Sequence, residues 1–288
     1  MPSSTVPVRV IQKRSARLAE ELDERPPEQV RAMDIVETAA RWVCRRRADV
    51  EVSTDVLPEK PEYTLVRESR NASPLVTGTR GRGGIAETLL GSVSPAVAGH
   101  AHRPTVVVRG SHDNRAMSGT HGRVVVGAGE KPAASAAMRF AFEEARHRAA
   151  PVEAVRAWRS PAHEATGRPL LAGEPARLHQ QQAVETLDEA LRDILTGVDA
   201  HGRTVEGHTR AVLVDASRDT DLLVIGARRG RRHFGLQSGR VVRGVLHHSA
   251  CPVVIVPEPT HTAGARPTRW ALLIQALALG RGLRFRSG

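Results

Sequence analysis

The chain has 288 residues, 40% of them hydrophobic and 25% charged, which is the composition of a globular protein with about two domains. Two cysteines, Cys44 and Cys251, are too few for a disulfide framework, and the apolar run at residues 270–279 is about ten residues long, short of the ~20 that cross a bilayer. We therefore expect a soluble protein of the reducing cytoplasm, without a membrane partner. The net charge of +11 comes mostly from arginine and only 3% of residues are aromatic, which disfavours a nucleic-acid partner.

The first hundred residues read as an incomplete alternation of helices and strands. A long helix is expected over about residues 15–47, followed by a strand at 50–56, a helix at 59–69 and a strand at 75–77. Pro74 stands at the start of the last strand, a position that proline tolerates best at the edge of a sheet.

The second half reads as a complete alternation. Strands are expected at residues 123–127, 151–158, 205–209, 221–225 and 252–256, and helices at 132–149, 174–196, 210–217 and 239–248. Unbroken apolar strands separated by helices are typical of a parallel sheet that is covered on both faces. The sequence therefore predicts a doubly wound α/β fold with five parallel strands in the order 3-2-1-4-5.

The two halves repeat one another. Residues 77–109 align without a gap on residues 225–257, so that each residue matches the one 148 positions later, as Val106 matches Val254. This repetition predicts a tandem of one fold. Strand one, helix one and strand two have no counterpart in the first copy. Because strands one and two join strand three to strand four in the predicted order, we expect the first copy to be broken through its middle.

The repeat divides the chain into four segments. We expect a partial copy over residues 1–110, a small polar linker over 111–122, a complete copy over 123–258 and a tail over 259–288. The tail is expected to be disordered apart from its short apolar segment.

A glycine-rich turn after strand four of the first copy predicts a phosphate-binding site. Its spacing is Gly78, two residues, Gly81, nine residues, then Gly91 and Ser92. Glycines let backbone N–H groups approach phosphate oxygens closely, and the N-terminus of the following helix favours an anion. The Ser92 hydroxyl adds a further donor.

This glycine spacing at the end of strand four resembles that of nucleotide-binding universal stress proteins, across residues 123–257 in full and about 15–109 in part. The resemblance implies a fold like that of the adenine nucleotide alpha hydrolases and a non-catalytic role in stress adaptation, with at most slow ATP hydrolysis. It implies ATP bound through Gly78, Gly81, Gly91 and Ser92. It also implies self-association through last strands that pair edge to edge.

The second copy departs from the family pattern. Gly129 stands where the family's ATP binders carry an aspartate, and Arg229 and Arg240 replace a glycine and the serine. We therefore expect a degenerate nucleotide site that comprises Gly127, Gly129, Gly226, Arg229, Gly239 and Arg240.

Two other functions stay open at this point. The chain could be a regulatory or dimerisation module without a ligand, which the loss of the aspartate favours for the second copy. It could instead be a basic nucleic-acid-associated protein, whose binding would weaken steeply with salt. No catalytic triad and no metal site are expected, since no nucleophile motif and no cluster of cysteines or carboxylates accompanies the histidines.

Overall fold

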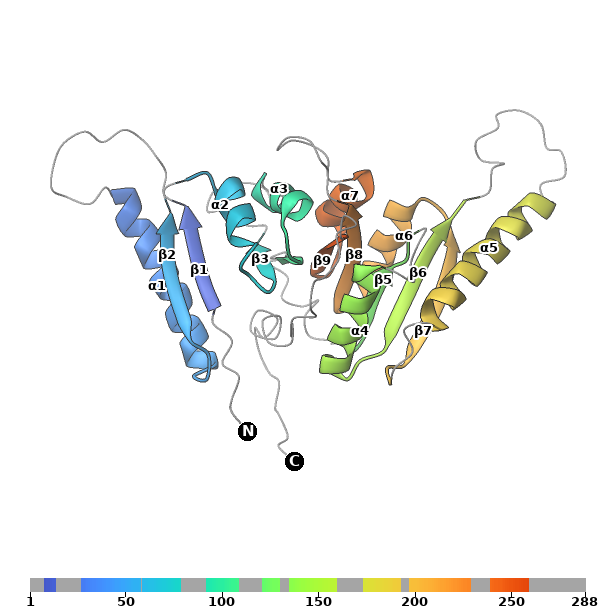
Figure 1. Ribbon diagram of the computed structural model, residues 1–288, viewed down its shortest axis with the longest axis horizontal. Helices are drawn as coiled ribbons and strands as arrows, with labels where there is room; N and C mark the ends of the chain where they lie inside the picture. The colour runs from blue at the N-terminus through green and yellow to red at the C-terminus, as the bar shows by residue number, and fades with distance from the viewer. Residues whose placement is uncertain are drawn as a thin grey trace. The chain divides into compact units, whose positions relative to one another are not determined.

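The computed structural model describes residues 8–13, 27–57, 59–78, 92–108, 121–129, 135–159, 173–192, 197–228 and 239–258. The chain divides into two compact units, with the boundary between Glu68 and Ser69. Helices alternate with strands in both units (Figure 1). Within the described ranges, no helix is long and apolar enough to cross a membrane.

The first unit is a small parallel pair of strands with two helices. It contains β1 (Val8–Lys13), α1 (Pro27–Arg46), β2 (Val52–Leu57) and α2 (Pro61–Glu68). β1 and β2 pair in parallel from Val8 opposite Val52 to Lys13 opposite Leu57. α1 packs on both strands and buries Ala32 and Val36, which lie one helical turn apart on one face.

The second unit is built on one seven-stranded sheet. Its elements are β3 (Leu75–Gly78), α3 (Val93–His100), β4 (Thr105–Val108), β5 (Val124–Gly127), α4 (Ala136–Arg148), β6 (Val152–Trp158), α5 (Gly173–Arg192), β7 (Ala200–Glu206), α6 (Thr209–Ala216), a 3-10 turn (Ser217–Asp219), β8 (Leu222–Arg228), α7 (Arg240–His248) and β9 (Val253–Glu258). The strand order is β3-β4-β9-β8-β5-β6-β7. All neighbours are parallel except β4 and β9.

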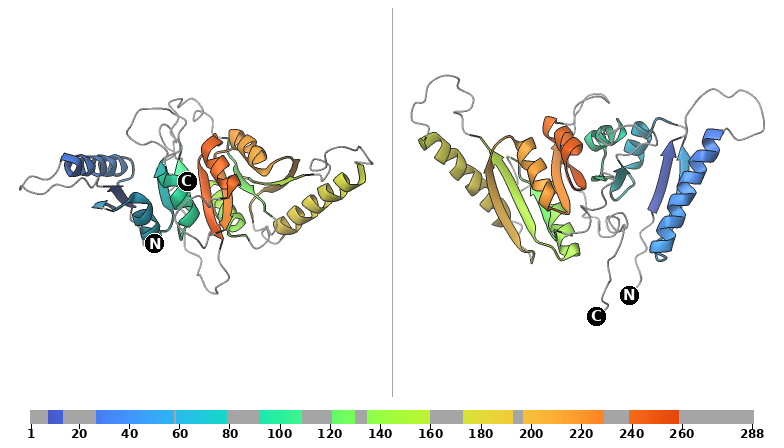
Figure 2. Two further views of the ribbon diagram at one scale, coloured as in Figure 1. Left: turned by 90° about the horizontal axis from the view of Figure 1, so that it is seen from above. Right: turned by 180° about the vertical axis from the view of Figure 1, so that it is seen from behind.

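The second copy forms the predicted doubly wound fold. Its strands lie in the order β7-β6-β5-β8-β9, which is the order 3-2-1-4-5 and confirms that prediction. α6 and α7 pack on one face of the sheet, around a core that includes Leu213, Leu223, Val245 and Ile255, while α4 and α5 cover the other face (Figure 2). The fully buried strand residues explain why these strands carry no polar alternation.

The last strands of the two copies pair with each other inside the chain. β4 and β9 are antiparallel, with Thr105 opposite Ile255, Val106 opposite Val254 and Val107 opposite Val253. This is the edge-to-edge pairing that the resemblance implies. Because β4 also pairs with β3, and β9 with β8, neither strand keeps an open edge in this sheet for a second chain. Self-association between separate chains stays a prediction.

Three details of the two copies correct the sequence prediction. The prediction that strand two is missing is wrong, because β1 pairs with β2 as β6 pairs with β7. The long helix accordingly begins at Pro27 instead of about residue 15. β7 lies at 200–206 instead of 205–209, since an exposed edge strand with polar residues gives no apolar run to read.

The break within the first copy is confirmed. β1 and β2 form a sheet of their own, and β3 is the edge strand of the large sheet, as Pro74 at its start indicates. Within the described ranges, strand one and helix one of the first copy have no counterpart. The segment boundaries at residues 110 and 123 stay a prediction, because the compact units divide the chain at Glu68 instead.

Candidate functional site

The candidate site of the second copy lies where β5 and β8 end side by side. In the doubly wound fold, helices leave these two strands toward opposite faces, and the crevice beyond their carboxyl ends is the usual ligand site. Gly127 ends β5 opposite Ile225, and Gly226 follows on β8. The fold therefore brings Gly127 and Gly226 of the predicted site together.

Beyond the end of β5, the side chain of Arg156 bonds the backbone at the position where the resemblance implies an aspartate. Gly129 follows β5, and a Cβ added there would have no atom within 4 Å. Arg156, on β6, donates a hydrogen bond from Nη1 to the Gly129 carbonyl oxygen. Its Nε is buried without a hydrogen-bond partner. A guanidinium thus holds the backbone at the position where the resemblance implies an aspartate.

On the other side of the crevice, a carboxylate lies against Gly226. Glu258, the last residue of β9, accepts hydrogen bonds at Oε1 from Ser135 Oγ at 2.9 Å and at Oε2 from Ala136 N at 3.4 Å. A Cβ added at Gly226 would lie only 2.7 Å from Oε1 of Glu258 and 3.5 Å from Cβ of Ala137. A larger residue at position 226 would therefore push the Glu258 carboxylate aside, whereas its contact with Ala137 would be an ordinary van der Waals one.

Ser135 fixes the start of α4 beside the carboxylate. Its backbone is extended, and its Oγ accepts a hydrogen bond from Ala137 N at 3.2 Å, which is the geometry of an N-cap. The helix therefore begins at Ala136, whereas the sequence predicts a start at Pro132. The Ser135 hydroxyl can do both tasks because it donates to Glu258 while it accepts from the helix.

The remaining positions of the second site are partly described. Gly239 directly precedes α7, and a Cβ added there would have no atom within 4 Å. Arg240 is the first residue of α7 and is exposed. Arg229 lies outside the described residues.

In the first copy, the structure brings the two ends of the predicted glycine turn together. Gly78 ends β3, and its carbonyl oxygen accepts a hydrogen bond at 3.2 Å from Oγ of Ser94, in the first turn of α3. Ser94 is buried, whereas Gly78 is exposed and a Cβ there would have no atom within 4 Å. Ser92 is exposed and directly precedes α3. Gly81 and Gly91 lie outside the described residues.

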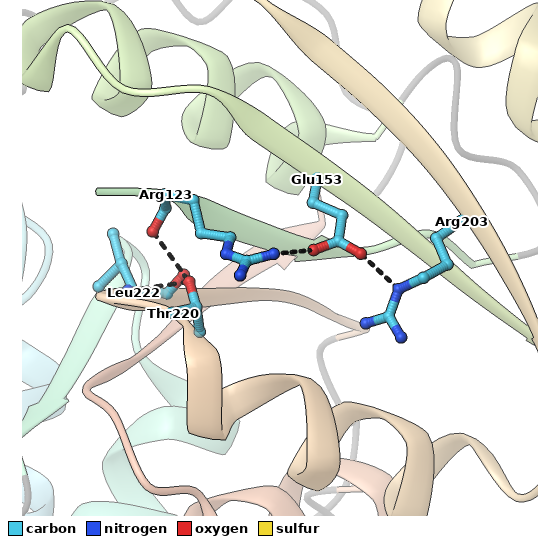
Figure 3. Close-up of polar contacts among 5 residues, drawn as sticks. All are labelled: Arg123, Glu153, Arg203, Thr220 and Leu222. Atoms are coloured by element: carbon cyan, nitrogen blue, oxygen red, sulfur yellow. Dashed lines mark hydrogen bonds and ion pairs between the residues drawn. The ribbon is translucent and has the colours of Figure 1, made fainter. Parts of the chain in front are cut away.

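A separate ionic cluster lies at the opposite, amino-terminal end of the strands. Glu153 lies between two arginines (Figure 3). Its Oε2 accepts a hydrogen bond from Nη1 of Arg123 at 3.2 Å, and its Oε1 accepts another from Nε of Arg203. Thr220 Oγ1 donates to the Arg123 carbonyl oxygen at 2.9 Å. These contacts tie β5, β6, β7 and the start of β8 together, so their role is structural. In the described part of the chain, no three histidine, cysteine or acidic residues are grouped as a metal site would require.

The two cysteines are expected to differ in reactivity. Burial raises the pKa of the Cys251 thiol to about 12, whereas Cys44 is exposed. Since the thiolate is the reactive form, a thiol reagent at pH 8 should modify Cys44 and leave Cys251 protected until the protein unfolds. Modification rates of Cys44→Ser and Cys251→Ser test this, and two equally fast thiols would contradict it.

Because the pKa of Cys251 is raised in the folded state, the contribution of its thiol to the free energy of unfolding should be lost as the pH rises from about 9 to 12.

Three residues of the second site escape prediction from the sequence: Ser135, Arg156 and Glu258. A serine before an alanine-rich helix is a usual N-cap signal, so Ser135 could have been found. Arg156 stands within a strand and Glu258 at the end of one, and no local pattern marks either.

Comparison with known families shows what the chain is similar to. The model of the universal stress protein family matches residues 5–109 and 120–257. The universal stress protein Rv1996 of Mycobacterium tuberculosis is 30% identical over 217 residues, which cover 74% of this chain and 68% of the relative. Universal stress protein MT2698 of the same species is 29% identical over 227 residues, or 79% of this chain and 74% of the relative.

Solved structures show the same fold. A universal stress protein from Archaeoglobus fulgidus superposes with a TM-score of 0.59 at 17% identity, covering 89% of this chain and 87% of its own. The functionally unknown protein PA1789 from Pseudomonas aeruginosa superposes with a TM-score of 0.54 at 12% identity, covering 88% of this chain and 83% of PA1789. Both cover far more than one copy of the repeat, and thus the likeness extends over the tandem.

Proposed function

Because the chain belongs to the universal stress protein family, we propose that it is a non-catalytic stress-adaptation protein whose first copy binds an adenine nucleotide. The phosphates would be held by Gly78, Gly81, Gly91 and Ser92, and the second copy would keep only a degenerate site. Two free cysteines and no disulfide framework agree with the cytoplasm as its compartment.

The observation that carries this proposal is the hydrogen bond from Ser94 to Gly78. It fixes the end of β3 against the first turn of α3, so that the strand end and the helix N-terminus that flank the predicted glycine turn lie together. This is the arrangement in which backbone N–H groups and the helix dipole favour a phosphate. No described atom lies within 4 Å of a Cβ added at Gly78, so the described part of the chain leaves room for the ligand there.

The second copy supports the contrast between the two sites. Beyond the ends of β5 and β8, Arg156 bonds Gly129, where an acid is expected, and the Glu258 carboxylate lies against Gly226, the counterpart of a phosphate-binding glycine. Both features act against an adenine nucleotide: the expected acidic side chain is missing, and the carboxylate repels phosphate by its charge. We therefore place the nucleotide in the first copy only.

A second candidate is a scaffold without a ligand. It is favoured by the absence of strand one from the first copy, within the described ranges, because that strand would carry the residues on the adenosine side. The nucleotide would then be held by its phosphates alone. No contact in the described structure favours the nucleic-acid alternative, and salt dependence separates it from both.

Titration of the full-length chain with a fluorescent ATP analogue tests the proposal. We expect saturable binding that persists at moderate salt, is abolished in Gly91→Arg, and is about fivefold weaker in Ser94→Ala. The latter loss corresponds to one neutral hydrogen bond. The arginine would fill the turn that the phosphates need.

Ser217→Ala is the matched control for the serine variant. Like Ser94, Ser217 is buried and its hydroxyl donates to a backbone carbonyl oxygen, that of Val214 at 2.6 Å. It also accepts a hydrogen bond from Ala250 N at 2.9 Å, and it lies in the second copy, away from the glycine turn. Its removal should leave the affinity unchanged. Absent binding, or binding that Gly91→Arg leaves intact, would favour the scaffold. Binding that disappears at moderate salt in every variant would favour a nucleic-acid partner.

A further inference from the structure

We infer that Glu258 determines what the second copy can bind: its carboxylate occupies the anion position of the crevice and excludes phosphate from it. This inference deepens the proposed function, since it rests on the equivalence of the two glycine turns. It assigns a role to a residue outside the glycine spacing.

The first step is the position of the carboxylate. Gly226 is the counterpart of Gly78, the first glycine of the phosphate-binding turn. Oε1 of Glu258 lies so close to Gly226 that a Cβ there would approach it to 2.7 Å. The carboxylate therefore lies directly against the backbone that a phosphate would have to approach.

The second step is what the carboxylate does there. Through Ser135 Oγ and Ala136 N it accepts hydrogen bonds from the first residues of α4, a helix of 13 residues. An anion at this place is stabilised by unpaired N–H groups and by the helix dipole. A carboxylate that is already bound supplies this anion from within the chain.

The third step is the comparison between the two copies. The counterpart of Glu258 in the first copy is Gly110, which carries no side chain. Among the described residues, no atom lies within 4 Å of a Cβ added at Gly78, whereas at Gly226 the carboxylate does. Within the described ranges the first copy has neither a carboxylate at the position of Glu258 nor a counterpart of α4 to hold one, so the internal anion belongs to the second copy.

Thermal unfolding of the full chain with added inorganic phosphate tests the inference. Glu258→Ala should lower the midpoint by about 2–4 °C, the shift expected for one lost capping interaction in a unit of this size. Phosphate should then restore most of this loss, because it enters the vacated position and binds only the folded state. In the wild-type protein, phosphate should raise the unfolding midpoint much less at equal ionic strength.

Two further variants complete the test. Glu206→Ala removes an exposed carboxylate at the end of β7, the same end of the sheet, and should respond to phosphate as wild type does. Glu258→Gln keeps the bulk without the charge, so it should regain less than Glu258→Ala, and it remains available if the alanine variant does not fold. Equal gains from phosphate in wild type and in both Glu258 variants would overturn the inference.

This outcome is distinguishable from failure of the proposed function. The ATP titration reports on the turn after β3 and responds to Gly91→Arg, while the phosphate rescue reports on the start of α4. Performing the rescue in a Gly91→Arg background removes any contribution from the first copy. Rescue without nucleotide binding would leave the role of Glu258 intact and remove the nucleotide from the first copy.

Discussion

Residues 118–260, produced without the first copy, are expected to form a dimer, whereas the intact chain supplies its own partner strand. Removing the first copy takes β4 away from β9 and leaves an open edge. The residues on that edge are apolar, and Val253, Val254, Ile255 and Val256 are at most 4% exposed in the intact chain. An uncovered edge of this kind pairs with another chain.

The register of β4 and β9 explains why the fragment can pair with itself. Val106 and Val254 lie opposite each other and occupy the same position of the repeat. Their neighbours exchange places symmetrically, with Thr105 opposite Ile255 and Val107 opposite Val253. The contact therefore has the two-fold symmetry of an isologous interface, although both strands belong to one chain. Two β9 strands could adopt it with Val254 opposite Val254.

Sedimentation equilibrium of the fragment at tens of micromolar measures this outcome. We expect a mass twice that of the fragment. Residues 69–260, which keep β3 and β4, are the control and should stay monomeric. A monomeric 118–260 fragment with native helix content would contradict the prediction, since it would show that β9 needs no partner strand.

The parts of the fold that could be predicted are those with apolar and periodic sequence. β5, β8 and β9 are buried on both faces, so each appears as an uninterrupted apolar run. Their order followed from the fold class, and the break in the first copy followed from the repeat. β1 was missed because six residues of mixed polarity without strict alternation, ahead of a long stretch without apolar periodicity, give a weak signal.

The candidate site was less accessible to sequence reasoning. The glycines were found because one spacing joins them within a single turn. The contact between Glu258 and Ser135 joins residues 123 positions apart, and it depends on β9 ending beside the start of α4. Such a contact follows from the packed sheet and not from any local pattern. The same holds for Arg156, whose partner Gly129 is 27 positions away.

Amide hydrogen exchange in the first unit is expected to be on the order of a hundredfold faster than in the second, because local opening costs less where few apolar side chains are buried. α1 and α5 provide a matched comparison, since both have 20 residues and occupy the same position of the repeat. α1 buries Ala32 and Val36, while α5 buries Ala183, Leu187, Ala190 and Leu191.

The two helices differ in this way because of the sheets beneath them. α5 packs on β6 and β7 within a seven-stranded sheet, whereas α1 packs on the two-stranded sheet of β1 and β2. An isolated pair of strands is marginally stable, so β1, α1 and β2 should exchange together. Mass spectrometry of peptic peptides from the full chain measures both helices in one experiment. Equal protection of α1 and α5 would show that the first unit is stabilised by more than its own described core, and that the break in the first copy has no energetic consequence.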